Sequence, residues 1–179
     1  KSKNLYGLEI YTSCEGFGDQ AEYIRDGLKW QKWSDNVEYL VGSDVVKALI
    51  INCTINSLSL FSFRQFLDHV IGIRQAHGLC ERHNIYEMVM SFNILRNPHF
   101  QSVMVLPKHI RDHFATNLEE FITTNSGIIT PYEEGSILRL TSYLRNVEEH
   151  PESNSSREDL AKDLKRFVLQ YDRRRKKDH

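Results

Sequence analysis

One apolar run, residues 45–54, limits most strongly what this chain can fold into. It reads Val-Val-Lys-Ala-Leu-Ile-Ile-Asn-Cys-Thr and is rich in branched side chains. A nearly continuous run of this kind is typical of a parallel strand that is covered on both faces. We therefore expect residues 45–54 to form a central strand of a parallel sheet.

Two further strands are indicated, one on each side of this run. Residues 5–12 mix Tyr, Ile and Leu with single polar residues and stop at a Gly-Phe-Gly loop, residues 16–18. Residues 86–95 form the other candidate strand. Pro98 follows it closely and ends the pattern, because proline lacks the N–H that a sheet ladder needs.

Between and after these strands, apolar residues recur at helical spacing. We expect two short helices in residues 21–40, broken near Gly27, and one helix over residues 60–76. Pro107 opens another helix and residues 133–148 form the next. Ser156 and Asp159 resemble a capping box before a last amphipathic helix. The alternation predicts an α/β fold with parallel pairing, although three strands are too few for a closed barrel.

Composition excludes several classes of protein. With 23 basic and 24 acidic residues, no global field draws the chain to nucleic acid or to an anionic membrane. The chain contains no stretch of about 18 apolar residues, so we expect no membrane partner. Three cysteines, an odd number at wide spacing, argue against a disulfide framework and for a reducing compartment. We therefore predict a cytoplasmic protein, and we do not expect nucleic acid as its partner.

Several short motifs, in chain order, carry a resemblance to a known family. Residues 12–18, Thr-Ser-Cys-Glu-Gly-Phe-Gly, are followed by Arg25-Asp26-Gly27 and Asn36. They resemble the fourth strand and helix of radical S-adenosylmethionine (SAM) enzymes, where the pattern is Ser-x-Asp-Gly, Arg-x-Gly and Asn. Glu15 stands in place of the usual Asp. Residues 52–56 are similar to the fifth strand and residues 92–98 to the sixth. Residues 100–102, 106–107 and 167–175 are similar to the twitch-domain subgroup.

This resemblance implies a fold and a cofactor chemistry. It implies the C-terminal half of a partial (β/α)6 TIM-like barrel over residues 1–125, and a helical extension over residues 126–179 that leads toward a twitch or auxiliary-cluster region. The intact enzyme would use SAM and a [4Fe-4S] cluster held at Cys-x-x-x-Cys-x-x-Cys. Cys14, Cys53 and Cys80 cannot reproduce that spacing. We therefore expect the missing strands upstream of Lys1, and this chain alone to be inactive.

The same resemblance implies five site residues. Ser13 and Arg25 match the positions that engage the ribose and the carboxylate of SAM. The alternative is that Ser13 caps a turn and that Arg25 is a solvated helix residue. Asn56 and Asn93 fall at the carboxyl ends of their strands, where an amide contacts adenine or ribose, or ties down a loop. Glu15 would orient Arg25, contact substrate or support the fold. The substrate is unknown, with a peptide or another macromolecule suiting the subgroup.

Two other hypotheses compete with this interpretation. One is that the chain is a small non-catalytic α/β domain. Its basic last helix, which carries Arg and Lys at residues 173–177, would then bind a protein or nucleic acid. A truncated barrel should expose an apolar edge near residues 6–11, whereas a complete small domain should protect it.

A metal site is a separate hypothesis. His77, Cys80 and His83 stand at three-residue spacing, but a fourth metal ligand is not evident. We expect that segment to be a solvated loop.

Overall fold

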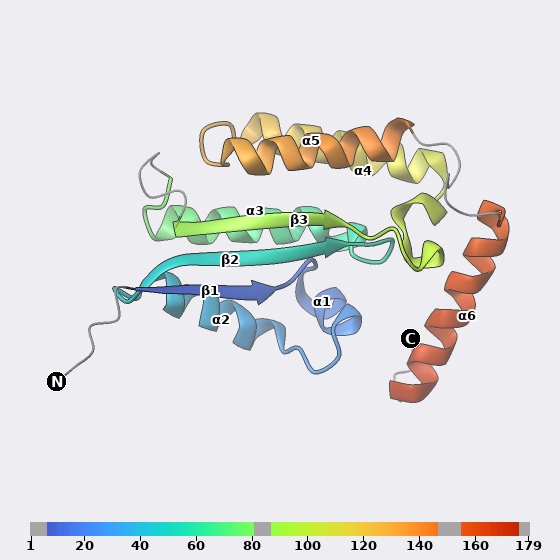
Figure 1. Cartoon of the computed structure of the whole chain (residues 1–179), viewed down its shortest axis with the longest axis horizontal. Coiled ribbons are helices and arrows are strands. Elements are labelled where there is room, and N and C mark those ends of the chain that lie inside the picture. The colour runs from blue at the N-terminus through green and yellow to red at the C-terminus, as the bar shows by residue number, and fades with distance from the viewer. Residues whose placement is uncertain (1–6, 81–86, 147–154, 176–179) are drawn as a thin grey trace.

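The computed structural model describes residues 7–80, 87–146 and 155–175. Three parallel strands, β1 (Leu8–Ser13), β2 (Val46–Ile55) and β3 (Met88–Ile94), form one open sheet in the order β1-β2-β3. Helices α1 (Gly18–Ile24) and α2 (Trp30–Val41) connect β1 to β2, and α3 (Leu60–Ala76) lies between β2 and β3 in the chain (Figure 1). The α/β class and the parallel pairing are therefore confirmed.

The helices that the structure describes cover one face of the sheet. On that face the β2 side chains Leu49, Ile51, Cys53 and Ile55 have no exposed surface, and Phe92 of β3 packs edge-on against Phe63 of α3. The alternate β2 residues are only half-buried, which corrects the expectation that the strand at residues 45–54 is covered on both faces. The run of branched residues predicted that other elements pack against both faces of this strand. The described helices pack against one of them. We call the other side the open face. Its residues are Glu9, Tyr11, Ser13, Ala48, Ile50, Asn52, Thr54, Val89, Ser91 and Asn93.

Helices α4 (Lys108–Thr124) and α5 (Pro131–Asn146) form an antiparallel pair beyond β3 (Figure 1). A reciprocal capping box starts α5: the Glu133 N–H donates to Thr130 Oγ1 at 3.1 Å, and the Thr130 N–H donates to Glu133 Oε2 at 2.8 Å. Ile137, Leu140 and Leu144 of α5 belong to the same hydrophobic core as the sheet. Among the described residues the sheet and α5 therefore share one core, and the predicted boundary between residues 125 and 126 stays a prediction.

The two edges of the sheet differ. Backbone groups on the outer edge of β3 are paired with side chains: the Met88 carbonyl accepts from Arg74, and the Met90 N–H donates to Glu133 at 2.7 Å. β1 is an edge strand with no further strand beside it in the described residues. Its Leu8 and Tyr11 side chains are 40% and 64% exposed. β1 is therefore an unpaired edge among the described strands and carries two exposed apolar side chains.

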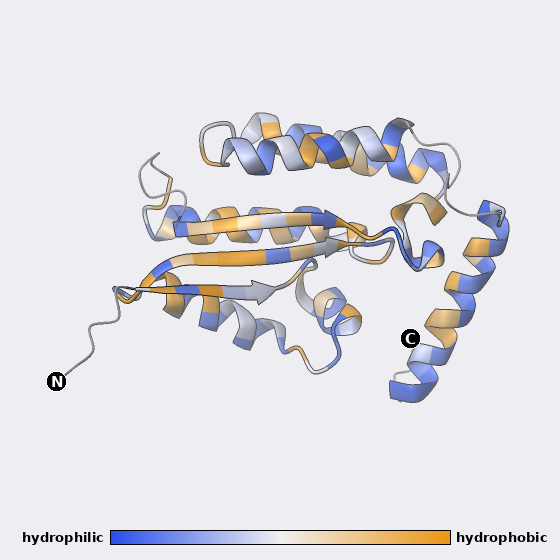
Figure 2. Ribbon diagram, viewed as in Figure 1, coloured by the Kyte–Doolittle hydropathy of each residue, from blue (hydrophilic) through white to orange (hydrophobic). Residues whose placement is uncertain are grey.

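Helix α6 (Arg157–Arg175) crosses the end of the molecule where the strands terminate (Figure 1). It contacts the short 3-10 helices η2 (His99–Gln101) and η3 (Val103–Val105), with Phe167 and Phe100 ring centroids 5.4 Å apart. Most residues of α6 are hydrophilic, and its apolar residues include the consecutive Phe167, Val168 and Leu169 (Figure 2). Ser156 accepts a hydrogen bond from the Asp159 N–H at 3.2 Å, as the sequence predicted for the start of this helix.

Candidate functional site

Polar side chains cross the open face near the carboxyl ends of the strands. Ser13 of β1 is in register with Asn52 of β2, and Asn52 is in register with Ser91 of β3. One step nearer the carboxyl ends, Thr54 is in register with Asn93. Paired residues of a parallel sheet point to the same side, so these groups form a polar strip across all three strands. Ligands of open α/β sheets bind at this end of the strands, which makes the strip the candidate site.

Glu15 and Arg25 form an ion pair beside this strip. Glu15 follows the end of β1 and its side chain is 4% exposed, whereas that of Arg25, just after α1, is 32% exposed. Arg25 Nε and Nη2 donate to the same carboxylate oxygen, Glu15 Oε2, at 3.0 and 2.5 Å. A buried carboxylate fixes the guanidinium on one side and leaves the other side facing outward. The pair was among the roles considered for Glu15 from the sequence.

Asn56 is committed to local structure. Its Oδ1 accepts from the N–H groups of Leu58 and Ser59 at 3.0 and 3.1 Å, and its Nδ2 donates to the Thr54 carbonyl. This arrangement is an Asx turn that connects β2 to α3. Both polar groups of the Asn56 amide therefore form hydrogen bonds within the turn. Of the two roles considered from the sequence, the structure shows the one in which Asn56 ties down a loop.

Ser13 and Asn93 are both exposed, but they lie on the two outer strands of the sheet. β2 separates them and Asn93 lies two residues further along the strands, so their backbones are about 12 Å apart, from two strand spacings and two residue rises. No described residue forms a hydrogen bond with either side chain. The structure thus brings Glu15 and Arg25 together, places Ser13 and Asn93 at opposite sides of the strip, and assigns Asn56 to a turn.

Helix α6 holds the segment that carries Arg25. The Tyr171 hydroxyl donates to the Ile24 carbonyl at 3.1 Å, and Arg175 pairs with the Asp26 carboxylate at 2.5 Å, so α6 binds both neighbours of Arg25. Arg175 also donates to the Tyr23 carbonyl at 2.5 Å. The Tyr23 hydroxyl in turn donates to Asp172 at 2.9 Å. We call these side chains of Tyr23, Asp26, Tyr171, Asp172 and Arg175 the α1–α6 contact.

The basic tail of α6 is only partly available to a partner. Arg173 and Arg174 are exposed, whereas the Arg175 side chain is 8% exposed and lies 4.4 Å from the Tyr171 ring centroid. Lys176 and Lys177 lie outside the described residues. The sequence did not predict that Arg175 packs against α1. A run of basic residues at a helix C-terminus is equally typical of solvated side chains that complement the helix dipole.

The thiols do not form a cluster site. Cys14 and Cys53 are fully buried, and burial raises the pKa of the Cys14 thiol to about 11 and that of Cys53 well above its usual value. Cys80 is half-buried at the far end of α3. In residues 7–80, 87–146 and 155–175 no group of three His, Cys, Asp or Glu side chains could hold a metal ion. His83, part of the spacing noted above, lies outside the described residues. An iron–sulfur cluster therefore does not fit the thiols of this chain.

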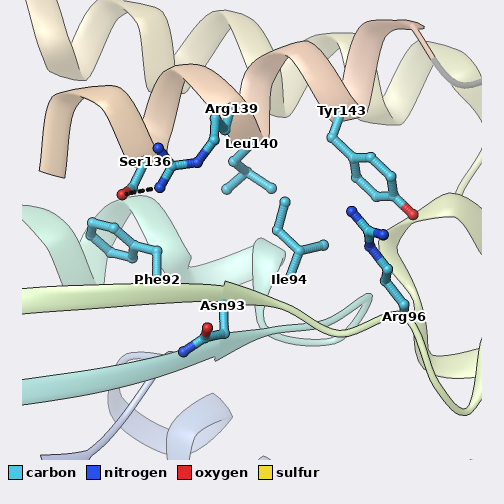
Figure 3. Close-up of a pocket in the computed structure, with 8 residues that line it drawn as sticks. All are labelled: Phe92, Asn93, Ile94, Arg96, Ser136, Arg139, Leu140 and Tyr143. Atoms are coloured by element: carbon cyan, nitrogen blue, oxygen red, sulfur yellow. Dashed lines mark hydrogen bonds between the residues drawn. The ribbon is translucent and has the colours of Figure 1, made fainter. Parts of the chain in front are cut away.

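A pocket of about 250 Å³ lies between β3 and α5. Asn93 is one of its lining residues, and so are Arg96, Ser136, Arg139 and Tyr143 (Figure 3). None of these except Asn93 was a candidate site residue from the sequence. Asn93 and Arg96 lie at or just after the end of β3, and the others lie on α5, at least 40 positions later in the chain. Helical periodicity gave no sign that these residues meet.

Comparisons with known proteins give no relative. No family model, no characterised protein and no solved structure matches this chain. Of the helices that the structure describes, none is both long enough and apolar enough to cross a lipid bilayer.

Proposed function

We propose that this chain is the C-terminal half of a radical SAM partial barrel and supplies one arm of the SAM cradle. The proposal rests on the sequence motifs around Ser13, Glu15 and Arg25, together with the asymmetry of the sheet. Side chains pair with two backbone groups on the β3 edge, no described strand pairs with the β1 edge, and one sheet face carries polar groups that the described helices do not cover. A sheet that ends at β3 and continues beyond β1 has the layout of the second half of a six-stranded partial barrel.

In this proposal Arg25 binds the carboxylate of SAM. A guanidinium suits a planar anion, and the ion pair with buried Glu15 fixes its orientation before the ligand arrives. Ser13 and Asn93 lie where a hydroxyl and an amide contact the ribose and the adenine. SAM and an iron–sulfur cluster held outside this chain would supply radical chemistry, and Ser13, Arg25 and Asn93 would hold the SAM in place. The thiols needed for the cluster would come from strands before β1.

The alternative, a non-catalytic domain that binds a partner through its basic last helix, has less support. Arg175 of that helix is packed onto α1 rather than presented to a partner. The exposed β1 edge is also the feature that a complete small domain would protect.

Binding of S-adenosylhomocysteine, followed through backbone amide shifts of the whole chain, tests the proposal. Half of a cradle should bind weakly, with a Kd of about 1 mM. We expect shifts at residues 13–16, 25 and 93, and about tenfold weaker binding by Arg25→Gln. Arg64→Gln is the matched control, because Arg64 is also ion-paired and its side chain is 33% exposed against 32% for Arg25. Shifts that are absent up to about 10 mM, or equal losses in both variants, would overturn the proposal.

The upstream coding sequence provides a second, independent test. A Cys-x-x-x-Cys-x-x-Cys motif within about 150 residues before Lys1, the size of a typical domain, would support the radical SAM reading. A start codon directly before Lys1 would count for the non-catalytic alternative.

A further inference from the structure

His69 of α3 lies against the loop that joins β1 to α1. Its ring centroid is 5.7 Å from that of Phe17 in this loop and 5.1 Å from that of Trp30 at the start of α2. The Phe17 and Trp30 rings also contact each other, with their centroids 4.8 Å apart. We call the rings of Phe17, Trp30 and His69 the imidazole cluster. The cluster joins α3, α2 and the loop through a single titratable side chain.

The surroundings of this imidazole disfavour its charged form. His69 is half-buried, and its Nε2 lies 2.8 Å from the Oγ of Ser34 on α2, a residue that is 2% exposed. Burial lowers the pKa of His69 below its ordinary value of 6.5, although the Glu38 carboxylate on α2 favours the charged ring. The loop and the start of α2 face the imidazole with uncharged aromatic rings. On α3 itself, the neighbouring Asp68 is paired with Arg64.

The loop is the part of the cluster that can move with the least loss of packing. Phe17 is 36% exposed and is flanked by glycines, and Gly18 has a backbone φ of +57°. The Phe17 N–H donates to Ser62 Oγ at 3.0 Å, which ties the loop to α3. Helix α2, in contrast, is fixed by Trp33, which is 8% exposed and donates to Thr12 Oγ1 at 2.9 Å. Release of the loop is therefore the smallest movement that brings water to the imidazole.

We propose that His69 is a pH-sensitive anchor of the β1–α1 loop. The neutral ring holds Phe17 against α2 and α3, and the protonated ring releases it so that water solvates the charge. Glu15 lies two residues before Phe17 and forms the ion pair with Arg25. Acid therefore loosens the segment that positions Glu15, and the orientation of Arg25 depends on pH. This device goes beyond the proposed SAM arm and is measurable without any ligand.

The docked loop loses stability as the pH falls. In the released state the imidazole regains its ordinary pKa of 6.5, whereas the docked state holds the pKa of His69 lower. The released state therefore binds more protons at every pH between these two pKa values, and release becomes more favourable as the pH falls through 6.5. Well above pH 6.5 the contribution of the docked loop is fully present.

Amide hydrogen exchange of the whole chain between about pH 7 and pH 5, corrected for the intrinsic pH dependence of exchange, tests this device. We expect the Phe17 N–H to lose about fivefold in protection, while residues 50–54 of β2 change by less than about twofold. The imidazole C–H signals in NMR spectra should give His69 a pKa below 6.5. An equal loss of protection in β2 would contradict a local device. A pKa at or above 6.5 would overturn the proposal, because attraction between the cation and the aromatic rings would then exceed the cost of burial.

Variants separate the charge of His69 from other effects of acid. His69→Gln stays neutral at every pH and keeps an amide that can bond to Ser34, so its Phe17 protection should change by less than about twofold. His113→Gln is the matched control, because His113 is exposed on α4 and lies 3.2 Å from Asn117 Nδ2. It should lose Phe17 protection as the wild type does, and a loss of the same size in His69→Gln would refute the role of His69.

The wild-type chain alone still decides the question if His69→Gln is not folded by circular dichroism. Its loss of Phe17 protection should begin as the pH falls through 6.5, in step with the imidazole signals of His69. A loss that begins only below about pH 5, where carboxylates take up protons, would overturn the proposal.

Discussion

Arg74 and Glu133 form a fully buried ion pair at the outer edge of β3. Both side chains have 0% exposure, and two guanidinium nitrogens donate to the two carboxylate oxygens at 2.5 and 3.0 Å. The pair also satisfies backbone groups: the Met88 carbonyl accepts from Arg74, and the N–H groups of Met90 and Thr130 donate to Glu133. The pair therefore satisfies two backbone groups at the edge of β3 and one N–H at the start of α5.

Glu133→Gln should destabilise the chain strongly. The substitution leaves the Arg74 charge buried without its counter-charge, and losing one partner of a buried pair costs about 3–5 kcal/mol. The free energy of unfolding from urea denaturation measures this loss. Glu119→Gln is the control, because Glu119 pairs with Arg145 at a surface where the side chains are 44% and 37% exposed, and such pairs contribute about 0–1 kcal/mol. A loss for Glu133→Gln no larger than that of the control would contradict a structural role for the pair.

Replacing both partners should not restore stability. In other proteins a buried pair can be exchanged for apolar residues at little cost. Here Arg74→Met combined with Glu133→Leu would leave the Met88 carbonyl and the Met90 N–H of an edge strand unpaired. We expect the double variant to unfold at a urea concentration no higher than that of Glu133→Gln. Recovery to wild-type stability would show that the backbone groups find other partners.

The α1–α6 contact should control the mobility of the Arg25 segment. Arg175→Gln removes the bonds to the Tyr23 carbonyl and to Asp26. We expect amide hydrogen exchange at residues 21–26 to become about tenfold faster, which corresponds to about 1.4 kcal/mol of local stability. The neighbouring variant Arg174→Gln, exposed on the same helix, should leave these rates unchanged. Equal acceleration in both variants would mean that charge on α6, rather than the Arg175 contact, sets the rates.

Thiol reactivity should single out Cys80. Burial raises the pKa of the Cys14 thiol from 9.0 to about 11, which lowers its thiolate fraction about 100-fold. Cys53 is also fully buried, with its pKa raised well above the usual value for the same reason. In the folded chain at about pH 8, dithionitrobenzoate should therefore react quickly with one thiol and, in urea, with three. Cys80→Ser should remove the fast phase, and a second fast thiol in that variant would contradict the burial of Cys14 and Cys53.

The order of strands and helices followed from the sequence because each signal was local. The break between α1 and α2 falls at Gly27, whose backbone φ of +82° is a conformation that glycine adopts most readily. Ser156 at the start of α6 was identified from its three-residue spacing to Asp159, and the Asp159 N–H does donate to its hydroxyl. The Thr130-Pro131-Tyr132-Glu133 capping box was missed, although threonine followed three residues later by glutamate is a recognisable start signal.

The contacts that shape the candidate site were not readable from sequence. Arg74 was simply a residue near the end of an apolar helix, yet its partner Glu133 lies 59 positions later. The α1–α6 contact joins residues about 150 positions apart, such as Tyr23 and Asp172. Long-range pairing of this kind leaves no periodicity in either segment. The sequence therefore suggested Glu15, Arg25 and Asn93 as candidates, whereas the positions of Arg96, Arg139 and Arg175 required the structure.

The α1–α6 contact should also weaken at high pH through Tyr23. Burial, reinforced by the hydrogen bond to the Asp172 carboxylate, raises the pKa of Tyr23 from 10.0 to about 12. Because the folded state holds this proton more tightly than the unfolded state, the contribution is fully present below pH 10 and is lost as the pH rises through about 12. Tyrosinate absorbance should show a late transition that disappears in Tyr23→Phe. In Tyr39→Phe, which alters a side chain that is 78% exposed, the late transition should persist. A late transition that survives in Tyr23→Phe would show that another tyrosine carries it, and the Tyr23–Asp172 hydrogen bond would then not be the pH-sensitive element of the contact.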